Sequence, residues 1–172
     1  ARAQRAAMDE RRHAPAMGAL ARAFGNESRR YESLPLPPRA VFELALDNAV
    51  EGCVRETYSA LVAHVQALSA EDARVRQAMR GIADDETEHA ALSLDIARWA
   101  EPKLSAVERL ALCEARDRAV RDLSGAATTS RHVGWEREVG LPTPEVATRL
   151  LEAFFAPDDI SIQSSKLVHA GS

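Results

Sequence analysis

The segment from residue 70 to residue 100 carries a stripe of side chains at helical spacing that is apolar except near its centre. The stripe consists of Met79, Ile82, Glu86, His89, Ser93 and Ile96. Burying a carboxylate costs several kcal/mol unless a partner compensates it, and a divalent cation is an effective partner. The pattern therefore predicts a helix whose buried face carries a functional glutamate and histidine.

Start and stop signals divide the chain into five predicted helices. A glycine-type stop at Gly25 ends the first helix, and Pro102 follows the third. The proline-rich connection 27–38 is long enough to cross one end of a bundle, and the short turn at Ser69 predicts an antiparallel hairpin. The expected helices are 2–24, 39–68, 70–100, 105–123 and 143–156, with a loop at 124–142 and an irregular tail from Pro157.

Composition narrows the class of protein. Hydrophobic residues make up 46% of the 172 residues and aromatic residues only 5%, which favours helices over a β-sandwich. The net charge of −4 gives no reason to expect nucleic acid, and no apolar run approaches the roughly 18 residues that span a bilayer. Cys53 and Cys113 belong to no Cys-x-x-Cys motif, which excludes a zinc ribbon or a rubredoxin-type iron centre. The first residue is alanine, so we expect a piece of a longer protein, and its compartment stays open, with the cytoplasm as the default.

Two copies of one short pattern, Ala-x-Asp-Glu-x-x-His-Ala, contain Glu10 and His13 in one case and Glu86 and His89 in the other. On a helix, residues three apart lie on one face, one turn above each other, where a carboxylate and an imidazole can bind one metal ion. In carboxylate-bridged dimetal bundles, each of two helices supplies such a pair, and each of two more supplies a single glutamate. The repeat predicts a metal site, with chance matches of solvated side chains as the alternative.

The helix between the two copies offers Glu51 as a single-glutamate ligand. Counted from the turn at Ser69, Glu51 lies about 18 residues back and Glu86 about 17 residues forward, so both are expected at one height in the bundle. This alignment favours Glu51 over Glu43 and Glu56.

At these residues the chain resembles the ferritin-like di-iron carboxylate superfamily, especially members with two Glu-x-x-His helices. Rubrerythrins, ribonucleotide reductase small subunits and bacterial multicomponent monooxygenases have that arrangement. The chain is most similar to uncharacterised ferritin-like domain proteins of GC-rich bacteria, through Glu51-Gly-Cys-Val-Arg-Glu-Thr-Tyr58 and Asp85-Glu-Thr-Glu-His89.

The resemblance covers about residues 3–100 and implies an all-α fold, a ferritin-like four-helix bundle with a crossover connection. Residues 1–102 would supply three of the four core helices, and 103–172 would form a C-terminal helical extension. The first bundle helix, with its own glutamate, would be missing from this chain. We expect an upstream segment to supply it, with completion by another chain or an incomplete site as alternatives.

The resemblance also implies the residues of the site. The metal ligands would be Glu10, His13, Glu51, Glu86 and His89. Asp9 and Asp85 match aspartates that hold the ligating imidazoles by hydrogen bonds. Arg55 would pair with a ligand carboxylate or lie on the surface. Tyr58 would be a redox-active or hydrogen-bonding catalytic residue, or a structural core tyrosine. Carboxylate and imidazole ligands suit two Fe or Mn ions.

The implied function is that of a dimetal, di-iron carboxylate oxidoreductase reacting with O₂ or H₂O₂, of the ferroxidase, peroxidase or oxidase kind. Its substrate and reductant are unspecified, and a homo-oligomer is compatible with it. One alternative is a non-catalytic helical scaffold or interaction module on a ferritin-like frame. Another is an RNA-modifying hydroxylase, which would require a basic surface patch near the site.

Overall fold

The computed structural model describes residues 1–27, 37–129 and 136–155, and over these residues it is helical without any strand. The elements, in chain order, are α1 (Arg2–Ala23), α2 (Val41–Asp47), η1 (Asn48–Glu56), α3 (Thr57–Ser69), α4 (Ala73–Ala100), η2 (Glu101–Lys103), α5 (Ala106–Thr129), α6 (Glu136–Val139) and α7 (Pro144–Phe155). The segment η1 is a π-helix and η2 is a 3₁₀-helix. The all-helical prediction is confirmed, whereas most of the expected crossover and the tail from Pro157 lie outside the described residues.

Two of the predicted boundaries differ from the structure. The helix expected at 39–68 is a continuous run of α2, η1 and α3, in which the π-helix interrupts regular α-helical geometry. The expected loop at 124–142 contains the end of α5 and all of α6. No proline follows Leu123 until Pro142, so nothing in that stretch forces α5 to stop, and the Ser124 hydroxyl donates back to the Val120 carbonyl at 3.0 Å.

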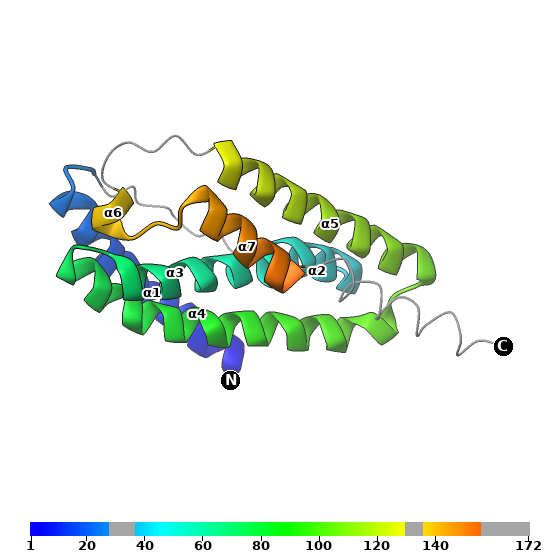
Figure 1. Cartoon of the computed structure of the whole chain (residues 1–172). Helices are drawn as coiled ribbons and strands as arrows, with labels where there is room; N and C mark the ends of the chain where they lie inside the picture. Colours follow the sequence, from blue (N-terminus) through cyan, green and yellow to red (C-terminus); the bar gives the residue numbers. More distant parts are fainter. Residues whose placement is uncertain (28–36, 130–135, 156–172) are drawn as a thin grey trace.

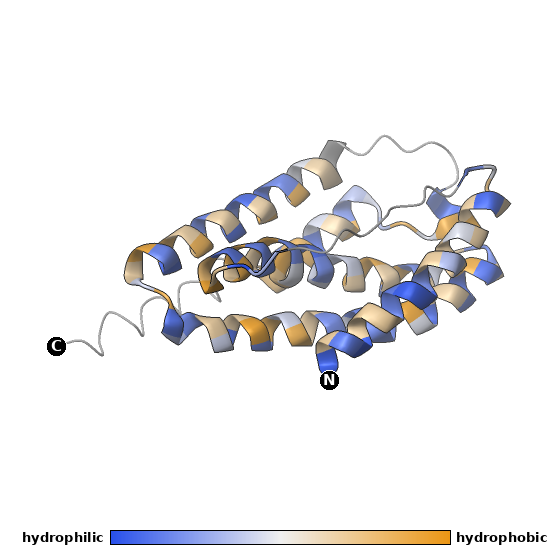
Figure 2. Ribbon diagram, turned by 180° about the vertical axis from the view of Figure 1, so that it is seen from behind, coloured by the Kyte–Doolittle hydropathy of each residue, from blue (hydrophilic) through white to orange (hydrophobic). Residues whose placement is uncertain are grey.

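Helices α3 and α4 form the antiparallel hairpin that the short turn predicts (Figure 1). Their interface consists mainly of alanines, which lets the two backbones approach closely around Val75 and Met79. Helix α1 packs across α4, as the view from behind shows (Figure 2), while α5 and α7 cover η1. No described helix has both the length and the apolar character to cross a membrane.

A short C-terminal segment holds the hairpin turn. The backbone N–H groups of Glu71 and Asp72 donate to the carbonyls of Arg137 and Glu138, each at 3.0 Å. Gly140 follows with φ of +68°, and a Cβ there would lie 2.5 Å from the backbone nitrogen of Ala70. This close approach requires glycine and fixes the start of α4, the helix that carries the second copy of the repeat.

Candidate metal centre

The two copies of the repeat face each other because α1 and α4 run in opposite directions. Arg2 pairs with Asp95 near the start of α1, and Asp9 and His13 contact His89 and Asp85 in turn further along. The antiparallel crossing relates the two copies by an approximate two-fold axis. Each contact made by one copy is therefore matched by an equivalent contact from the other.

The aspartates form crossed hydrogen bonds with the histidines. His13 Nε2 lies 3.0 Å from Asp85 Oδ2, and His89 Nε2 lies 3.3 Å from Asp9 Oδ2. An ionised carboxylate only accepts hydrogen bonds, so each Nε2 carries the proton and donates it. The lone pair of each Nδ1 is then free to bind a metal ion.

Both Nδ1 atoms point at the two glutamates. His13 Nδ1 lies 3.3 Å from Glu86 Oε1 and 3.7 Å from Glu10 Oε1. His89 Nδ1 lies 3.4 Å from Glu10 Oε1 and 3.9 Å from Glu86 Oε2. The centroids of the two imidazole rings are 6.1 Å apart, so four lone-pair donors surround one small volume.

This donor set fits metal ions. Ligand atoms of Glu10, His13 and Glu86 all lie within 4.8 Å of one another. Two atoms that each bind one ion at about 2.1 Å, as nitrogen and oxygen ligands do in zinc sites, lie about 3 to 3.5 Å apart. At these distances an unprotonated Nδ1 and a carboxylate oxygen repel each other unless a proton or a metal ion lies between them. A bound cation removes that repulsion.

Burial differs between the two ends of the site. The side chains of His13 and His89 are 9% and 5% exposed, whereas the Glu10 side chain is 59% exposed. Burial and the neighbouring Glu10 raise the pKa of Glu86. The imidazoles of the cluster are therefore buried, whereas Glu10 is open to small molecules.

Arg12 joins the two aspartates. Its Nη2 contacts Asp9 Oδ1 and lies 3.2 Å from Asp85 Oδ2. The hydrogen bond from Arg12 lowers the pKa of Asp9, which keeps that carboxylate ionised as an acceptor for His89. Sequence reasoning did not single out Arg12. The available signal was its place directly before His13, one turn after Asp9 on the helix.

A third glutamate, Glu56, faces the cluster from the end of η1. Its Oε2 accepts a 3.4 Å hydrogen bond from the Ser93 hydroxyl, one turn beyond His89 on α4. Burial raises the pKa of Glu56, nearby His89 lowers it, and Glu10 raises it. Glu56 is thus close enough to Glu10 of one pair and His89 of the other for their charges to shift its pKa.

Glu51 is not brought to the cluster in this structure. Its side chain is 59% exposed, and its Oε1 accepts a 2.9 Å hydrogen bond from Nη1 of Arg55, which is itself exposed. Tyr58 lies elsewhere again, half-buried beside the apolar cluster of Val54, Ala119, Leu151 and Phe155, and burial raises its pKa. Among the described residues, Arg55 pairs with the expected ligand Glu51, and Tyr58 belongs to the core.

The π-helix η1 explains why side chains expected on one face of the helix 39–68 point in different directions. The alignment with Glu51 assumes about 100° per residue, but η1 has wider turns from Asn48 onward. Val54, three residues after Glu51, is completely buried against α5 and α7, while Glu51 is exposed. Gly52 lies against Ser93, and a Cβ at Gly52 would be only 2.5 Å from the Ser93 hydroxyl oxygen. The one glycine of this helix therefore lies at a close approach to α4 that leaves no room for a side chain.

A groove of about 800 Å³ borders the aspartate side of the cluster. Its lining includes Asp9, Asp85 and His89 together with Arg5 and Arg12. It gives solvent a route to the hydrogen bonds that hold the imidazoles.

Comparison of the chain with protein-family models, curated proteins and solved structures gives no match. The geometry of the cluster is therefore the basis for assigning a function.

Proposed function

We propose that the chain is part of a ferritin-like protein whose α1–α4 cluster binds two Fe or Mn ions and reacts with O₂ or H₂O₂. The observation that carries this proposal is the reciprocal arrangement of the two repeats. Each histidine donates Nε2–H to the aspartate of the opposite helix and directs Nδ1 at both glutamates. A chance surface pair of Glu-x-x-His motifs has no reason to adopt this symmetry.

The charges of the cluster support the binding of cations. Five carboxylates converge there, and the guanidinium of Arg12 contacts two of them. The carboxylates belong to Asp9, Glu10, Glu56, Asp85 and Glu86. Buried negative charge is costly unless it is compensated, and bound divalent ions compensate it directly.

The ligand types favour iron or manganese. Carboxylate oxygen and imidazole nitrogen suit these ions, and no thiolate lies among the cluster residues to favour a softer metal. When bound, the pair of ions would supply two-electron chemistry toward O₂ or H₂O₂. The protein would supply the rest: Asp9 and Asp85 would fix the ring orientations, Glu10 and Glu86 would bind the ions, and the exposed side of Glu10 would admit the oxidant.

The ferritin-like assignment extends the proposal from the site to the fold. It is supported by the hairpin of α3 and α4, by the antiparallel packing of α1 on α4, and by candidate ligands from α1 and α4 that meet close to Glu56 of η1. The substrate and the reductant follow from neither the ligands nor the helices.

Metal titration of the purified chain tests this proposal. We expect about two Fe(II) or Co(II) ions to bind per chain under anaerobic conditions. Glu86→Gln and His13→Ala should each bind fewer ions, because each substitution removes one ligand of the two symmetry-related pairs. His64→Ala is the matched control, since His64 is exposed and bonds to Thr87 rather than to the cluster. Addition of O₂ or H₂O₂ to the loaded protein should then oxidise Fe(II) faster than it oxidises free Fe(II).

A wild-type chain that folds normally by circular dichroism but binds no metal would overturn the proposal. In that case the scaffold alternative predicts that Glu86→Gln raises the free energy of unfolding, because it removes a buried carboxylate whose pKa is raised by burial. If the chain binds metal but does not accelerate the oxidation of Fe(II), the metal site stands and the oxidoreductase function is overturned.

A further inference from the structure

A proline divides α1 just after the first copy of the repeat. Pro15 lies inside the helix, two residues beyond His13. A proline within a helix donates no backbone hydrogen bond, and its ring crowds the carbonyl of the residue four positions earlier, here Arg11. Helices bend most readily at such positions. Pro15 therefore separates a first segment, residues 2–14, which carries the repeat, from a second segment, residues 16–23.

The second segment is anchored in the apolar core. Leu20, together with Phe24 directly after the helix, packs against the buried cluster of the α3–α4 hairpin. The Arg74 guanidinium lies over the Phe24 ring, 6.0 Å from its centroid. Gly18 is buried as well. Apolar contact therefore fixes this half of α1 without the help of any ligand.

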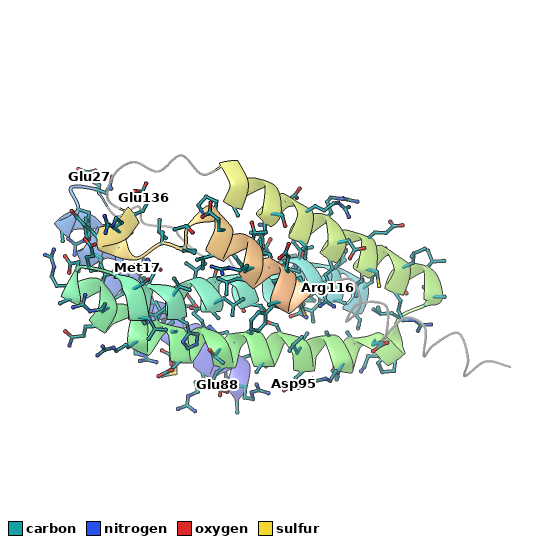
Figure 3. All side chains as sticks on the ribbon, viewed as in Figure 1. Met17, Glu27, Glu88, Asp95, Arg116 and Glu136 are labelled. Carbon is teal, nitrogen blue, oxygen red and sulfur yellow. The ribbon has the colours of Figure 1, made fainter. Side chains whose placement is uncertain are left out.

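The first segment is held to α4 by polar and charged side chains. Its buried residues are Asp9 and His13, and none of its apolar side chains is fully buried. Besides the crossed aspartate–histidine hydrogen bonds, Arg2 pairs with Asp95, which Figure 3 labels, and these two side chains are 48% and 47% exposed. An exposed ion pair contributes little to stability, because solvent screens it. The first segment therefore lacks the kind of contact that holds the second.

A cation would change the sign of two contacts between the first segment and α4. His13 Nδ1 lies 3.3 Å from Glu86 Oε1, and His89 Nδ1 lies 3.4 Å from Glu10 Oε1, so both contacts join α1 to α4. An unprotonated nitrogen and a carboxylate oxygen repel each other at these distances, whereas a divalent ion between them attracts both. The cation supplies an attraction that the apolar side chains of the first segment do not.

We infer that residues 2–14 form a hinged segment, which turns about Pro15 and which a divalent cation closes onto α4. Helix α4 is the fixed side, because it packs along α3. Without the cation the hinged segment is undocked for part of the time, and an unpacked helix of about 12 to 15 residues is only marginally stable in water. This inference rests on the proposed function, since it needs a cation between the two copies of the repeat.

Hydrogen exchange of the purified chain, followed by mass spectrometry with and without Co(II), tests the inference. Residues 7–14 are compared with residues 17–23, which leaves out the first turn of the helix, where fraying is expected in any case. In wild type without metal, the amides of 7–14 should exchange faster. Saturating Co(II) should slow their exchange at least about tenfold, because a ligand favours the state that binds it by mass action, and should leave 17–23 unchanged.

The substitution Pro15→Ala tests the hinge itself. Alanine restores the hydrogen bond to the Arg11 carbonyl and removes the crowding there. Without metal we expect residues 7–14 to exchange several-fold more slowly than in wild type, and Co(II) to have a smaller further effect. Pro144→Ala is the matched control. Pro144 is the first residue of α7, a position that favours proline, so its replacement should leave exchange in α1 unchanged.

The outcomes separate this inference from the function beneath it. If wild type binds Co(II) but residues 7–14 exchange equally fast with and without it, the hinged segment is overturned and the metal centre stands. If Pro15→Ala exchanges like wild type, the hinge at Pro15 is overturned. If Pro144→Ala slows exchange in α1 as much as Pro15→Ala does, a general change in stability replaces the hinge. If wild type binds no Co(II), the inference and the proposed function are both overturned.

Discussion

At the scale of single residues, Arg12 connects the two halves of the centre. It contacts Asp9 and Asp85, which in turn hold the imidazoles of His89 and His13. A metal-binding histidine depends on the group behind its second nitrogen for its tautomer and orientation. The guanidinium thus acts on both rings at once, although it touches neither.

We expect Arg12→Gln to lower metal affinity about 10- to 100-fold, the usual effect of losing a group that orients ligands. The measurement is Co(II) titration combined with ¹⁵N NMR of the imidazoles, in which the Nδ1-lone-pair tautomer of His13 and His89 should become less populated. Arg11→Gln, at the adjacent exposed position, is the matched control. If metal affinity and the histidine tautomers are unchanged in Arg12→Gln, Arg12 has no role in orienting His13 and His89.

The residue pattern predicted the parts of the site that depend on local spacing. Glu10 with His13, and Glu86 with His89, share a face because three residues make nearly one turn of any α-helix. The pairing of each aspartate with a histidine follows from the same spacing, once the helices cross. The contact between Arg12 and Asp85 could not be predicted from the repeat. The repeat does not conserve the arginine, because Glu88 stands in the second copy at the position of Arg12 in the first.

At the scale of elements, the hairpin was predictable and its register was not. Counting from a turn at Ser69 places Glu51 level with Glu86, but α3 ends at Ser69 and α4 begins only at Ala73. The contacts instead pair Glu56 with Ser93. The π-helix adds to the displacement, and no residue type in η1 announces it except Gly52.

The start of α4 has an acid-sensitive cap. Asp72 Oδ1 accepts a 2.7 Å hydrogen bond from the backbone N–H of Arg74, and the Arg74 side chain bonds the same carboxylate. These bonds, the side-chain bond first, lower the pKa of Asp72 to about 2. The unfolded-state pKa is about 3.9, so the folded state binds this proton less tightly. The stabilisation is complete above about pH 4 and is lost as the pH falls toward 2.

We therefore expect wild type to lose more unfolding free energy between pH 4 and pH 2 than Asp72→Asn does. Asparagine still caps the helix but does not titrate there. Urea denaturation at a series of pH values measures this difference. Asp84→Asn, at an exposed position within the same helix, is the control and should keep the acid dependence of wild type. Identical curves for Asp72→Asn and wild type would contradict the account of the cap.

At the scale of the whole molecule, three layers of contact position the centre. The short segment that ends at Gly140 fixes the turn before α4. Helices α5 and α7 pack on η1, and α1 crosses α4 so that the two repeats meet (Figure 1). Composition and periodicity predicted helices but not this crossing, because the partner of a helix face depends on contacts distant in sequence. The cluster therefore depends on all three sets of contacts.

The central claim is that two cations lie between the rings of His13 and His89. Anomalous scattering at the iron edge, from crystals grown anaerobically with Fe(II), locates and identifies any such ions in one measurement. The account predicts two peaks within bonding distance of the two Nδ1 atoms and of Glu10 and Glu86. An iron-soaked crystal with no peak there, or with peaks confined to surface carboxylates, would contradict it.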